Sequence, residues 1–261
     1  MKKLLVIGFV LPEPNSSAAG TRMMQLISLF LKANYQITFA TTAQNVAFSE
    51  DLKKYPINVV SIQLNSGSFD VFVKQLNPNI VLFDRFMTEE QFGWRVTKNC
   101  PNALTLLDTE DLHFLRLARQ QAVKENRDFT NNDLFSETAK REIAAILRCD
   151  ISLLVSEYEM DLLVKIFKIN PQILHYLPLF AEKIDGTPSF ETRKDFVFIG
   201  NFLHEPNYDA IKYLKTHIWN KIKEKLPGVS MQIYGAYATQ KVFDSQHKAD
   251  RFFVNGRAEN A

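Results

Sequence analysis

The sequence predicts an α/β protein with one complete doubly wound domain, residues 1–180, and a partial second domain of the same kind, residues 196–261. Three observations carry this prediction. Short apolar runs alternate with longer amphipathic stretches, as in a parallel sheet covered by helices. A polar stretch with Gly and Pro, residues 181–195, then interrupts the pattern. A new strand–helix–strand unit begins after it.

The apolar runs of the first domain are continuous rather than alternating, which is typical of strands buried on both faces of a parallel sheet. The first run follows two lysines, as in a weak signal peptide, but Pro12, Glu13 and Pro14 interrupt it and no small-residue cleavage site follows. We therefore interpret it as a first buried strand. The predicted strands span residues 4–10, 36–42, 58–64, 79–84, 103–108 and 151–156.

Helices are predicted between most of these strands. In residues 21–33, Met24, Ile27 and Leu31 recur at helical spacing. Two further helices are expected to begin at capping boxes, in which a hydroxyl residue stands three positions before Glu or Gln. These pairs are Thr88 with Gln91 and Ser156 with Glu159.

Residues 181–195 are polar and aperiodic, which indicates a linker. The remaining stretch of about 65 residues is half of a doubly wound domain, whose usual size is ~100–150 residues. Because such a half-sheet exposes an apolar edge and faces, we expect the chain to be C-terminally truncated. The alternative is that the partial unit packs on the first domain as a cap. Its predicted elements are strands at 196–201, 230–236 and 251–257 and a helix from about Asn207 to Leu226.

Composition excludes several classes of partner. The chain is 46% hydrophobic and 23% charged, and its net charge of +2 argues against a nucleic-acid partner. Cys100 and Cys149 lack metal-site or disulfide spacing, so we expect no metal and a reducing, cytoplasmic location. No apolar stretch reaches the ~18 residues that span a bilayer, although a peripheral membrane contact stays open.

Ligands of parallel α/β sheets bind at the carboxyl ends of the strands, so the loops there hold the candidate site. The loop after the first strand is rich in small residues, and the helix that follows offers free N–H groups. We expect substrate contacts from four residues of this loop, although an ordinary strand–helix connection is an equal alternative. They are Ser17, Gly20, Thr21 and Arg22.

Two more strand ends carry charged side chains. Asp84 and Arg85 end the strand at 79–84, where a structural ion pair and a substrate contact are equal alternatives. After the strand at 103–108, Glu110 and Asp111 begin the next helix, where carboxylates suit the positive end of the helix dipole. His113 falls in its first turn, with Arg116 one turn further on the same face. We select His113 as the catalytic candidate and Asp84, Arg85 and Asp111 as substrate-binding candidates.

The second domain repeats the arrangement in residues 198–210. Gly200 follows the strand, Asn207 is expected to cap the next helix, and Asn201 and His204 face the same edge. We therefore select Gly200, Asn201 and His204 as donor-side candidates. The glycine fingerprint of nicotinamide-dependent enzymes is absent.

Several stretches resemble the retaining glycosyltransferases of the GT-B fold, family four. The resemblance covers nearly the whole chain, and GNFLHEPN and DTEDLH are its most specific parts. The stretches are SSAAGTR (16–22), DTEDLHFLR (108–116), CDISLLVSEYE (149–159), YLP (176–178) and FVFIGNFLHEPNYDAIKYL (196–214).

The resemblance implies a GT-B-like fold of two Rossmann-like domains, an acceptor-side one and a donor-side one. It implies transfer from a nucleotide-diphosphate sugar with retention of configuration and no cofactor or metal, to a glycan, lipid or protein acceptor. It also implies that His113 lies near the transferred sugar and that residues 16–22 lie near donor phosphates or acceptor. The family's Arg and Lys for the donor diphosphate are not evident in GNFLHEPN.

Two hypotheses follow. The first is a glycosyltransferase of the hexosyltransferase type that is inactive in this truncated form. The second is a non-catalytic binding module or a degenerate transferase, which the missing basic pair favours.

Overall fold

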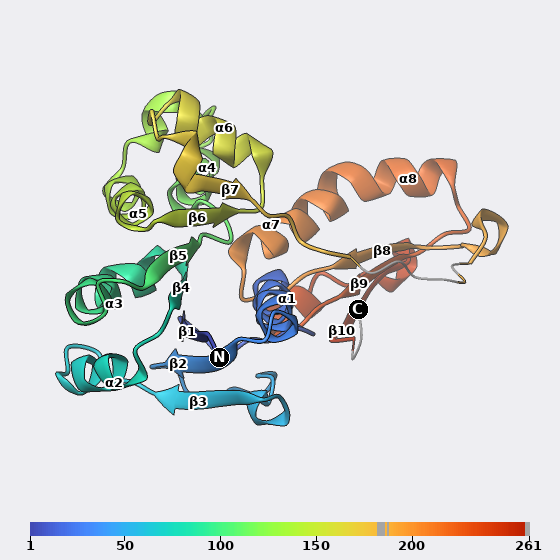
Figure 1. Cartoon of the computed structure of the whole chain (residues 1–261). Helices are drawn as coiled ribbons and strands as arrows, with labels where there is room; N and C mark the ends of the chain where they lie inside the picture. Colours follow the sequence, from blue (N-terminus) through green and yellow to red (C-terminus); the bar gives the residue numbers. More distant parts are fainter. Residues whose placement is uncertain (182–185, 187, 259–261) are drawn as a thin grey trace. The chain divides into compact units, whose positions relative to one another are not determined.

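The computed structural model describes residues 1–181, 186 and 188–258 (Figure 1). The chain divides into two compact units, and the strand–helix loop Glu13–Thr21 is grouped with the second. Unit 1 comprises Met1–Pro12 and Arg22–Phe180, and unit 2 comprises Glu13–Thr21 and Ala181–Ala261. The predicted linker at 181–195 includes residues 182–185 and 187, which lie outside the described residues.

Unit 1 contains a seven-stranded parallel sheet of order β3-β2-β1-β4-β5-β6-β7 (Figure 1). The order reverses between β1 and β4, so their carboxyl ends form a topological switch point. The strands are β1 (Lys3–Gly8), β2 (Gln36–Thr41), β3 (Ile57–Ser61), β4 (Ile80–Asp84), β5 (Leu104–Asp108), β6 (Ile151–Leu154) and β7 (Leu174–Tyr176).

Helices cover both faces of this sheet. They are α1 (Ala18–Lys32), α2 (Ser68–Leu76), α3 (Arg85–Asn99), α4 (His113–Lys124), α5 (Glu137–Arg148) and α6 (Glu157–Lys165). Short 3₁₀ turns complete the unit at η1 (Leu52–Lys54), η2 (Asn131–Leu134) and η3 (Pro171–Ile173).

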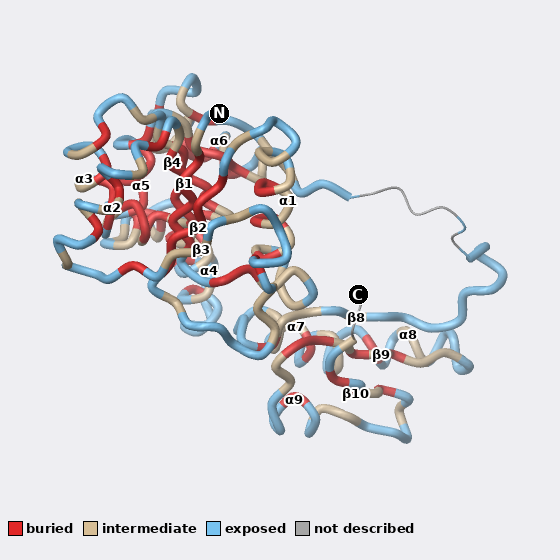
Figure 2. Tube along the Cα trace, turned by 60° about the horizontal axis from the view of Figure 1, so that its bottom comes forward, coloured by how far each residue is buried: buried red, intermediate tan, exposed pale blue. Residues whose placement is uncertain are grey.

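Successive residues of a strand point to opposite faces, and β1 shows the consequence. Leu5 and Ile7 belong to one buried cluster, and Leu4 and Val6 belong to the other. The buried parts of the chain gather around β1, β2 and β4 (Figure 2). Burial on both faces explains why the apolar runs are continuous.

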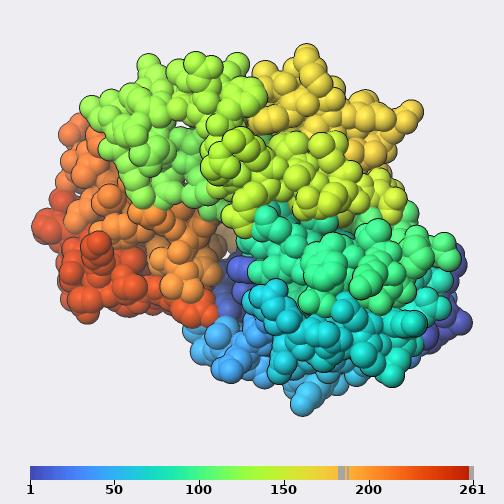
Figure 3. Space-filling view, turned by 90° about the vertical axis from the view of Figure 1, so that its left-hand side faces the viewer, coloured from blue at the N-terminus to red at the C-terminus, as the bar shows by residue number. Residues whose placement is uncertain are grey.

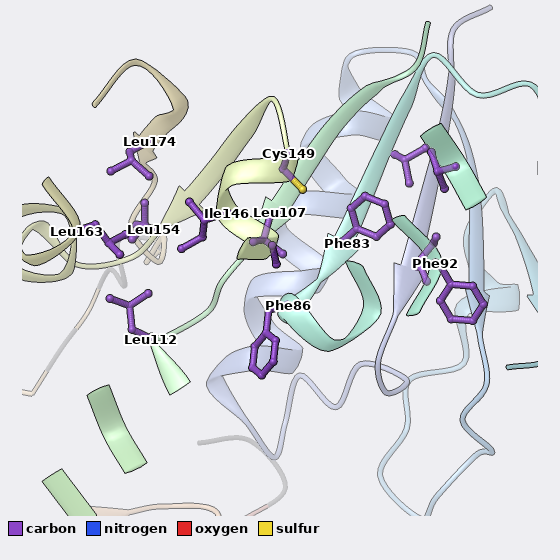
Figure 4. Packing of buried hydrophobic residues seen from close by; sticks show 14 of the residues in the cluster. Phe83, Phe86, Phe92, Leu107, Leu112, Ile146, Cys149, Leu154, Leu163 and Leu174 are labelled. Atoms are coloured by element: carbon purple, nitrogen blue, oxygen red, sulfur yellow. The ribbon is translucent and has the colours of Figure 1, made fainter. Parts of the chain in front are cut away.

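The cluster that contains Leu5 also anchors the start of α4. Leu112 is fully buried there, together with Phe86 and Leu154 (Figure 4). The residue after Leu112 is His113, so the packing of Leu112 fixes where α4 begins. The helices α3 and α5, which also pack against this cluster, lie side by side at the surface (Figure 3).

Unit 2 contains a three-stranded parallel sheet of order β10-β9-β8. Its core gathers around Trp219, Ile233 and Phe252. Its strands are β8 (Phe196–Ile199), β9 (Met231–Tyr234) and β10 (Phe252–Gly256), and its helical elements are α7 (Glu205–Tyr213), the π-helical segment η5 (Leu214–Trp219), α8 (Asn220–Lys225), α9 (Gln240–Phe243), η4 (Phe190–Thr192) and η6 (Lys248–Asp250).

The fold class is therefore confirmed: one complete doubly wound unit precedes a smaller unit with a parallel sheet of its own. No helix in the described part of the chain is both long enough and apolar enough to span a bilayer.

Three expectations about helix starts are wrong. The helix assigned to Thr88 begins at Arg85, directly after β4, and the Thr88 hydroxyl donates to the Asp84 carbonyl instead of capping. Asn207 lies inside α7, which begins at Glu205, and its side-chain amide donates to the Asn201 carbonyl instead of capping the helix. Glu110 and Asp111 precede α4, which begins at His113.

A fourth helix start, at Ser156, is confirmed. The Ser156 side chain accepts from the Glu159 N–H and caps α6. The Glu159 carboxylate, which a capping box would turn back onto Ser156, accepts instead from the N–H of Leu112.

Candidate functional site

The carboxyl ends of β4 and β5 bring two aspartates together. Asp84 and Asp108 are register partners on these neighbouring strands, and both are buried. Asp84 Oδ2 accepts from the N–H of Phe9 at 2.9 Å, whereas its Oδ1 has no hydrogen-bond partner among the described residues. Two like charges side by side in a buried place require nearby cations.

Arg22 supplies the first cation. Its Nε lies 2.8 and 3.0 Å from the two carboxylate oxygens of Asp108, and its side chain is 3% exposed. Its Nη1 donates to the carbonyl of Leu177 at 2.7 Å. Arg22 therefore ties α1 to the end of β5 and to the segment after β7. It lies in the second turn of α1, because that helix begins at Ala18, three residues earlier than expected.

The environment of Asp108 shifts its proton affinity. Burial raises the pKa of Asp108 to about 6, an effect that Arg22 opposes and Asp84 reinforces. This carboxylate is thus held in its charged form mainly by Arg22.

Arg85 supplies the second cation. Its Nε and Nη2 donate to Glu110 Oε2 at 3.0 and 2.9 Å, and Asp84 Oδ1 lies 3.6 Å from Nε. The guanidinium also lies over the Phe9 ring, 5.4 Å from its centroid. Burial raises the pKa of Glu110 to about 7, and Asp84 adds to the rise while Arg85 opposes it. The predicted Asp84–Arg85 pair is therefore part of a larger charge cluster.

Arg85 and Glu110 share an unusual backbone conformation. Their φ values are +70° and +60°, in the left-handed region that non-glycine residues rarely adopt. Each such residue costs on the order of 1 kcal/mol, so the surrounding contacts must hold it in place. The two residues follow the ends of β4 and β5 and pair with each other, and strain of this kind gathers at functional sites.

His113 is the first residue of α4, so the prediction that it lies in the first helical turn is confirmed. Its side chain is 15% exposed, and its ring meets the Phe86 ring edge-on at 5.6 Å. Asp111 lies beside it and accepts from Arg116 Nε at 2.6 Å. The carboxyl edge of the unit 1 sheet therefore brings together five of the selected residues: Arg22, Asp84, Arg85, Asp111 and His113.

The loop Glu13–Thr21 uses most of its polar groups internally. Ser17 Oγ accepts from the N–H of Gly20, and Thr21 Oγ1 donates to the Pro14 carbonyl. A Cβ on Gly20 would lie 2.4 Å from backbone atoms of Glu13, so this position requires glycine. The small residues thus serve the packing of the loop itself. Within the same unit, Tyr237 donates to the Glu13 carboxylate at 2.9 Å.

The donor-side candidates form a compact turn in unit 2. The N–H of Gly200 donates to the Tyr234 carbonyl at 3.1 Å, which extends the pairing of β8 with β9. Asn201 Oδ1 accepts from the N–H of Leu203, and His204 is the N-cap residue of α7. A Cβ on Gly235 would lie 1.8 Å from the Gly200 carbonyl oxygen, so two backbones pass closely here.

Sequence reasoning did not select three residues that complete the cluster: Asp108, Glu110 and Glu142. Asp108 is the last residue of the predicted strand at 103–108 and Glu110 is expected to begin the next helix, so their local positions account for both. Glu142 is 1% exposed and lies on the face of α5 that also buries Ala139, Ala145 and Ile146. The sequence signal that could have identified Glu142 is an acidic residue on an otherwise apolar helix face.

Among the residues that the structure describes, no group of three or more His, Cys, Asp or Glu side chains is arranged to hold a metal ion. The carboxylates of the site contact arginines or backbone N–H groups instead.

Comparison with known proteins gives matches at the level of structure. No family model and no curated protein matches the sequence. A structure of S. aureus TarM in complex with Fondaparinux, alpha-GlcNAc-glycerol and UDP superposes with a TM-score of 0.67 at 10% identity, covering 99% of this chain and 78% of that one. Sucrose-phosphate synthase from Thermosynechococcus elongatus gives 0.60 at 14% identity, covering 99% and 71%.

A third structure, WaaG, a glycosyltransferase involved in lipopolysaccharide biosynthesis, gives a TM-score of 0.59 at 8% identity, covering 98% of this chain and 70% of that one. At these identities the likeness concerns the fold alone. The chain therefore has the GT-B fold of these glycosyltransferase structures, as the resemblance implied.

Proposed function

We propose that this protein is a glycosyltransferase that moves a sugar from a nucleotide-diphosphate sugar to an acceptor. The observation that carries the proposal is a histidine held at the carboxyl edge of a GT-B-type sheet, beside buried and paired charges. Neighbouring structures support the choice of donor, because those of TarM and MnaA from S. aureus hold UDP. Retention of configuration, a hexosyl group and a glycan, lipid or protein acceptor belong to the same proposal.

His113 and Arg85 each have a proposed task. His113 offers a ring nitrogen to a hydroxyl of the transferred sugar. Arg85 is held by Glu110 and Asp84, so it is oriented before substrate arrives. Such preorganisation favours the charge that develops in a transition state, because no solvent must rearrange at the moment of reaction.

The test is a transfer and hydrolysis assay with UDP-, GDP- and ADP-sugars. The sheet of unit 2 exposes Val197 and Ile199, which supports the expectation that residues 1–261 alone bind a nucleotide sugar weakly and are inactive. The assay is therefore run on the full gene product as well as on these residues. His113→Ala should lower kcat/KM by ~10²–10³-fold. Wild-type rates in this variant would remove His113 from the mechanism.

A second candidate function is a binding module that holds a sugar or nucleotide without transferring it. The turn after β8 favours it, because the basic pair that the resemblance implies for the donor diphosphate is not evident there: Asn201 Oδ1 accepts from the N–H of Leu203, and His204 is the N-cap of α7. Calorimetric binding of UDP without turnover of any nucleotide sugar by the full gene product would support this alternative.

A further inference from the structure

The N-terminus of α4 lacks a cap of its own. The first N–H groups of a helix have no partner within it, and a Ser, Thr, Asp or Asn at the N-cap usually accepts from one of them. The N-cap residue here is Leu112, whose side chain has no acceptor. The free N–H groups must therefore find acceptors elsewhere.

Two carboxylates from other helices take this role. Glu159 of α6 accepts from the Leu112 N–H at 3.1 Å. Glu142 of α5 accepts from the His113 N–H at 3.1 Å and from the Phe114 N–H at 3.0 Å, one with each oxygen. Both carboxylates are buried at the positive end of the helix dipole, which favours negative charge.

Glu142 differs from Glu159 because it also faces the imidazole. His113 Nδ1 lies 3.2 Å from the Asp111 carbonyl, 3.5 Å from Asp111 Oδ1 and 3.6 Å from Glu142 Oε1. All three are acceptors, a carbonyl and two carboxylate oxygens. The Asp111 carbonyl is the one within hydrogen-bond distance, and the two carboxylates act on Nδ1 through their negative charge. A ring nitrogen in these surroundings carries the proton, so in the neutral ring Nε2 carries the lone pair.

We infer that Glu142 is a positioning residue whose buried charge, added to the acceptors of Asp111, fixes the tautomer of His113 and presents Nε2 as a hydrogen-bond acceptor. The inference rests on the proposed function for its consequence, which is that His113 accepts a hydrogen bond from a hydroxyl of the sugar. Its structural half, the Nδ1–H tautomer, can be tested without any substrate. A residue that served only to cap α4 would not control the state of the ring.

The experiment compares Glu142→Gln with Glu159→Gln. Both variants remove a buried carboxylate that caps the same helix, but only Glu142 faces the imidazole. Gln at 142 accepts at one end only and turns an NH₂ group toward its other partner. We expect nitrogen NMR of ¹⁵N-histidine-labelled protein at about pH 9, where an imidazole is neutral, to show the Nδ1–H form of His113 in wild type and Glu159→Gln. Glu142→Gln should shift the ring toward Nε2–H.

Either of two results overturns the inference: the wild-type tautomer in Glu142→Gln, or an equal shift in Glu159→Gln. If Glu142→Gln does not fold, Glu142→Asp takes its place. It keeps the charge but withdraws it from the ring, so it should raise the Nε2–H fraction, and an unchanged fraction overturns the inference.

The consequence of the tautomer for catalysis is measured separately, by enzyme kinetics. In the full gene product, Glu142→Gln should lower kcat/KM by roughly tenfold or more, because a ring with the wrong tautomer cannot accept, while Glu159→Gln should stay near wild type. A protein without transferase activity would refute the proposed function and leave the NMR result standing. A tautomer shift without loss of activity would refute the link between them.

Discussion

At the scale of single residues, Asp108 links folding to pH. Its pKa is about 6 in the folded protein and ordinarily 3.8, because burial outweighs the ion pair with Arg22. Between these values the folded state keeps a proton that the unfolded state has released, so stability falls as pH rises. The free energy of unfolding therefore has a negative slope against pH. We expect Asp108→Asn to make this slope less negative between about pH 4 and pH 6, by at most ~1.4 kcal/mol per pH unit. Urea unfolding at a series of pH values measures it.

Glu90→Gln is the control, because the pKa of Glu90 is shifted in the opposite direction to that of Asp108 and both residues lie in unit 1. A hydrogen bond from Arg141 lowers the pKa of Glu90, so its stabilising effect is lost only as pH falls below the ordinary glutamate range. The slope between about pH 5 and pH 6 should therefore match wild type in Glu90→Gln. Identical slopes in Asp108→Asn and wild type would contradict the buried, proton-retaining state of Asp108.

Gly20 and Gly67 make a second residue-scale pair. A Cβ on Gly20 would lie 2.4 Å from backbone atoms of Glu13, whereas one on Gly67 would meet nothing within 4 Å. Gly20→Ala should destabilise the protein by about 1–3 kcal/mol, because backbone cannot yield as a side chain does. Gly67→Ala should stay within about 1 kcal/mol of wild type. Chemical denaturation of both variants measures the two free energies of unfolding. Equal losses of stability would contradict the close approach of backbone atoms at Gly20.

At the scale of elements, α5 depends on a side-chain cap. Ser136 Oγ accepts from the N–H of Ala139 at 3.1 Å. Ser136→Ala should cost about 1 kcal/mol, while Ser136→Gly, which is tolerated at an N-cap, should cost only a few tenths. Both variants lose the hydroxyl, so the difference between their urea midpoints measures how much better water reaches the free N–H when no methyl group is present. A Ser136→Ala midpoint equal to wild type would show that water caps α5 as well as the hydroxyl does.

The helix starts also show what local sequence can and cannot indicate. Ser156 caps α6 as its spacing predicts, because both partners lie in one turn. Thr88 has the same spacing and lies inside α3, because the chain enters that helix directly from β4 through the left-handed Arg85. The cap of α4 comes from Glu142, nearly thirty positions along the chain, and no local pattern reports such a partner.

At the scale of the whole molecule, buried strands were the easiest elements to predict. The inner strands β1, β2 and β4 have continuous apolar runs, because both of their faces are covered. The edge strand β3 carries Asn58 within its run, and its residues are only partly buried or exposed. β7 was not predicted, since it is three residues long and exposes His175 and Tyr176. The grouping of Glu13–Thr21 with unit 2 depends on contacts such as Tyr237 with Glu13, which no local pattern encodes.

Among the described residues, the two faces of the unit 2 sheet differ in burial, and two isoleucines test the difference. Ile233 of β9 is fully buried with Trp219, whereas Ile199 of β8 is 53% exposed. Ile233→Ala should cost about 2–5 kcal/mol, because it leaves a cavity in a packed core, and Ile199→Ala should cost under 1 kcal/mol.

The two tryptophans of the chain allow this measurement on unit 2 alone. Trp94 is exposed in unit 1, and Trp219 is buried in unit 2. In a Trp94→Phe background, tryptophan fluorescence therefore reports the unfolding of unit 2. Should Ile199→Ala prove as costly as Ile233→Ala in that background, the outer face of β8 must be covered in solution. Size-exclusion chromatography with light scattering would then show whether a second copy of the chain covers it.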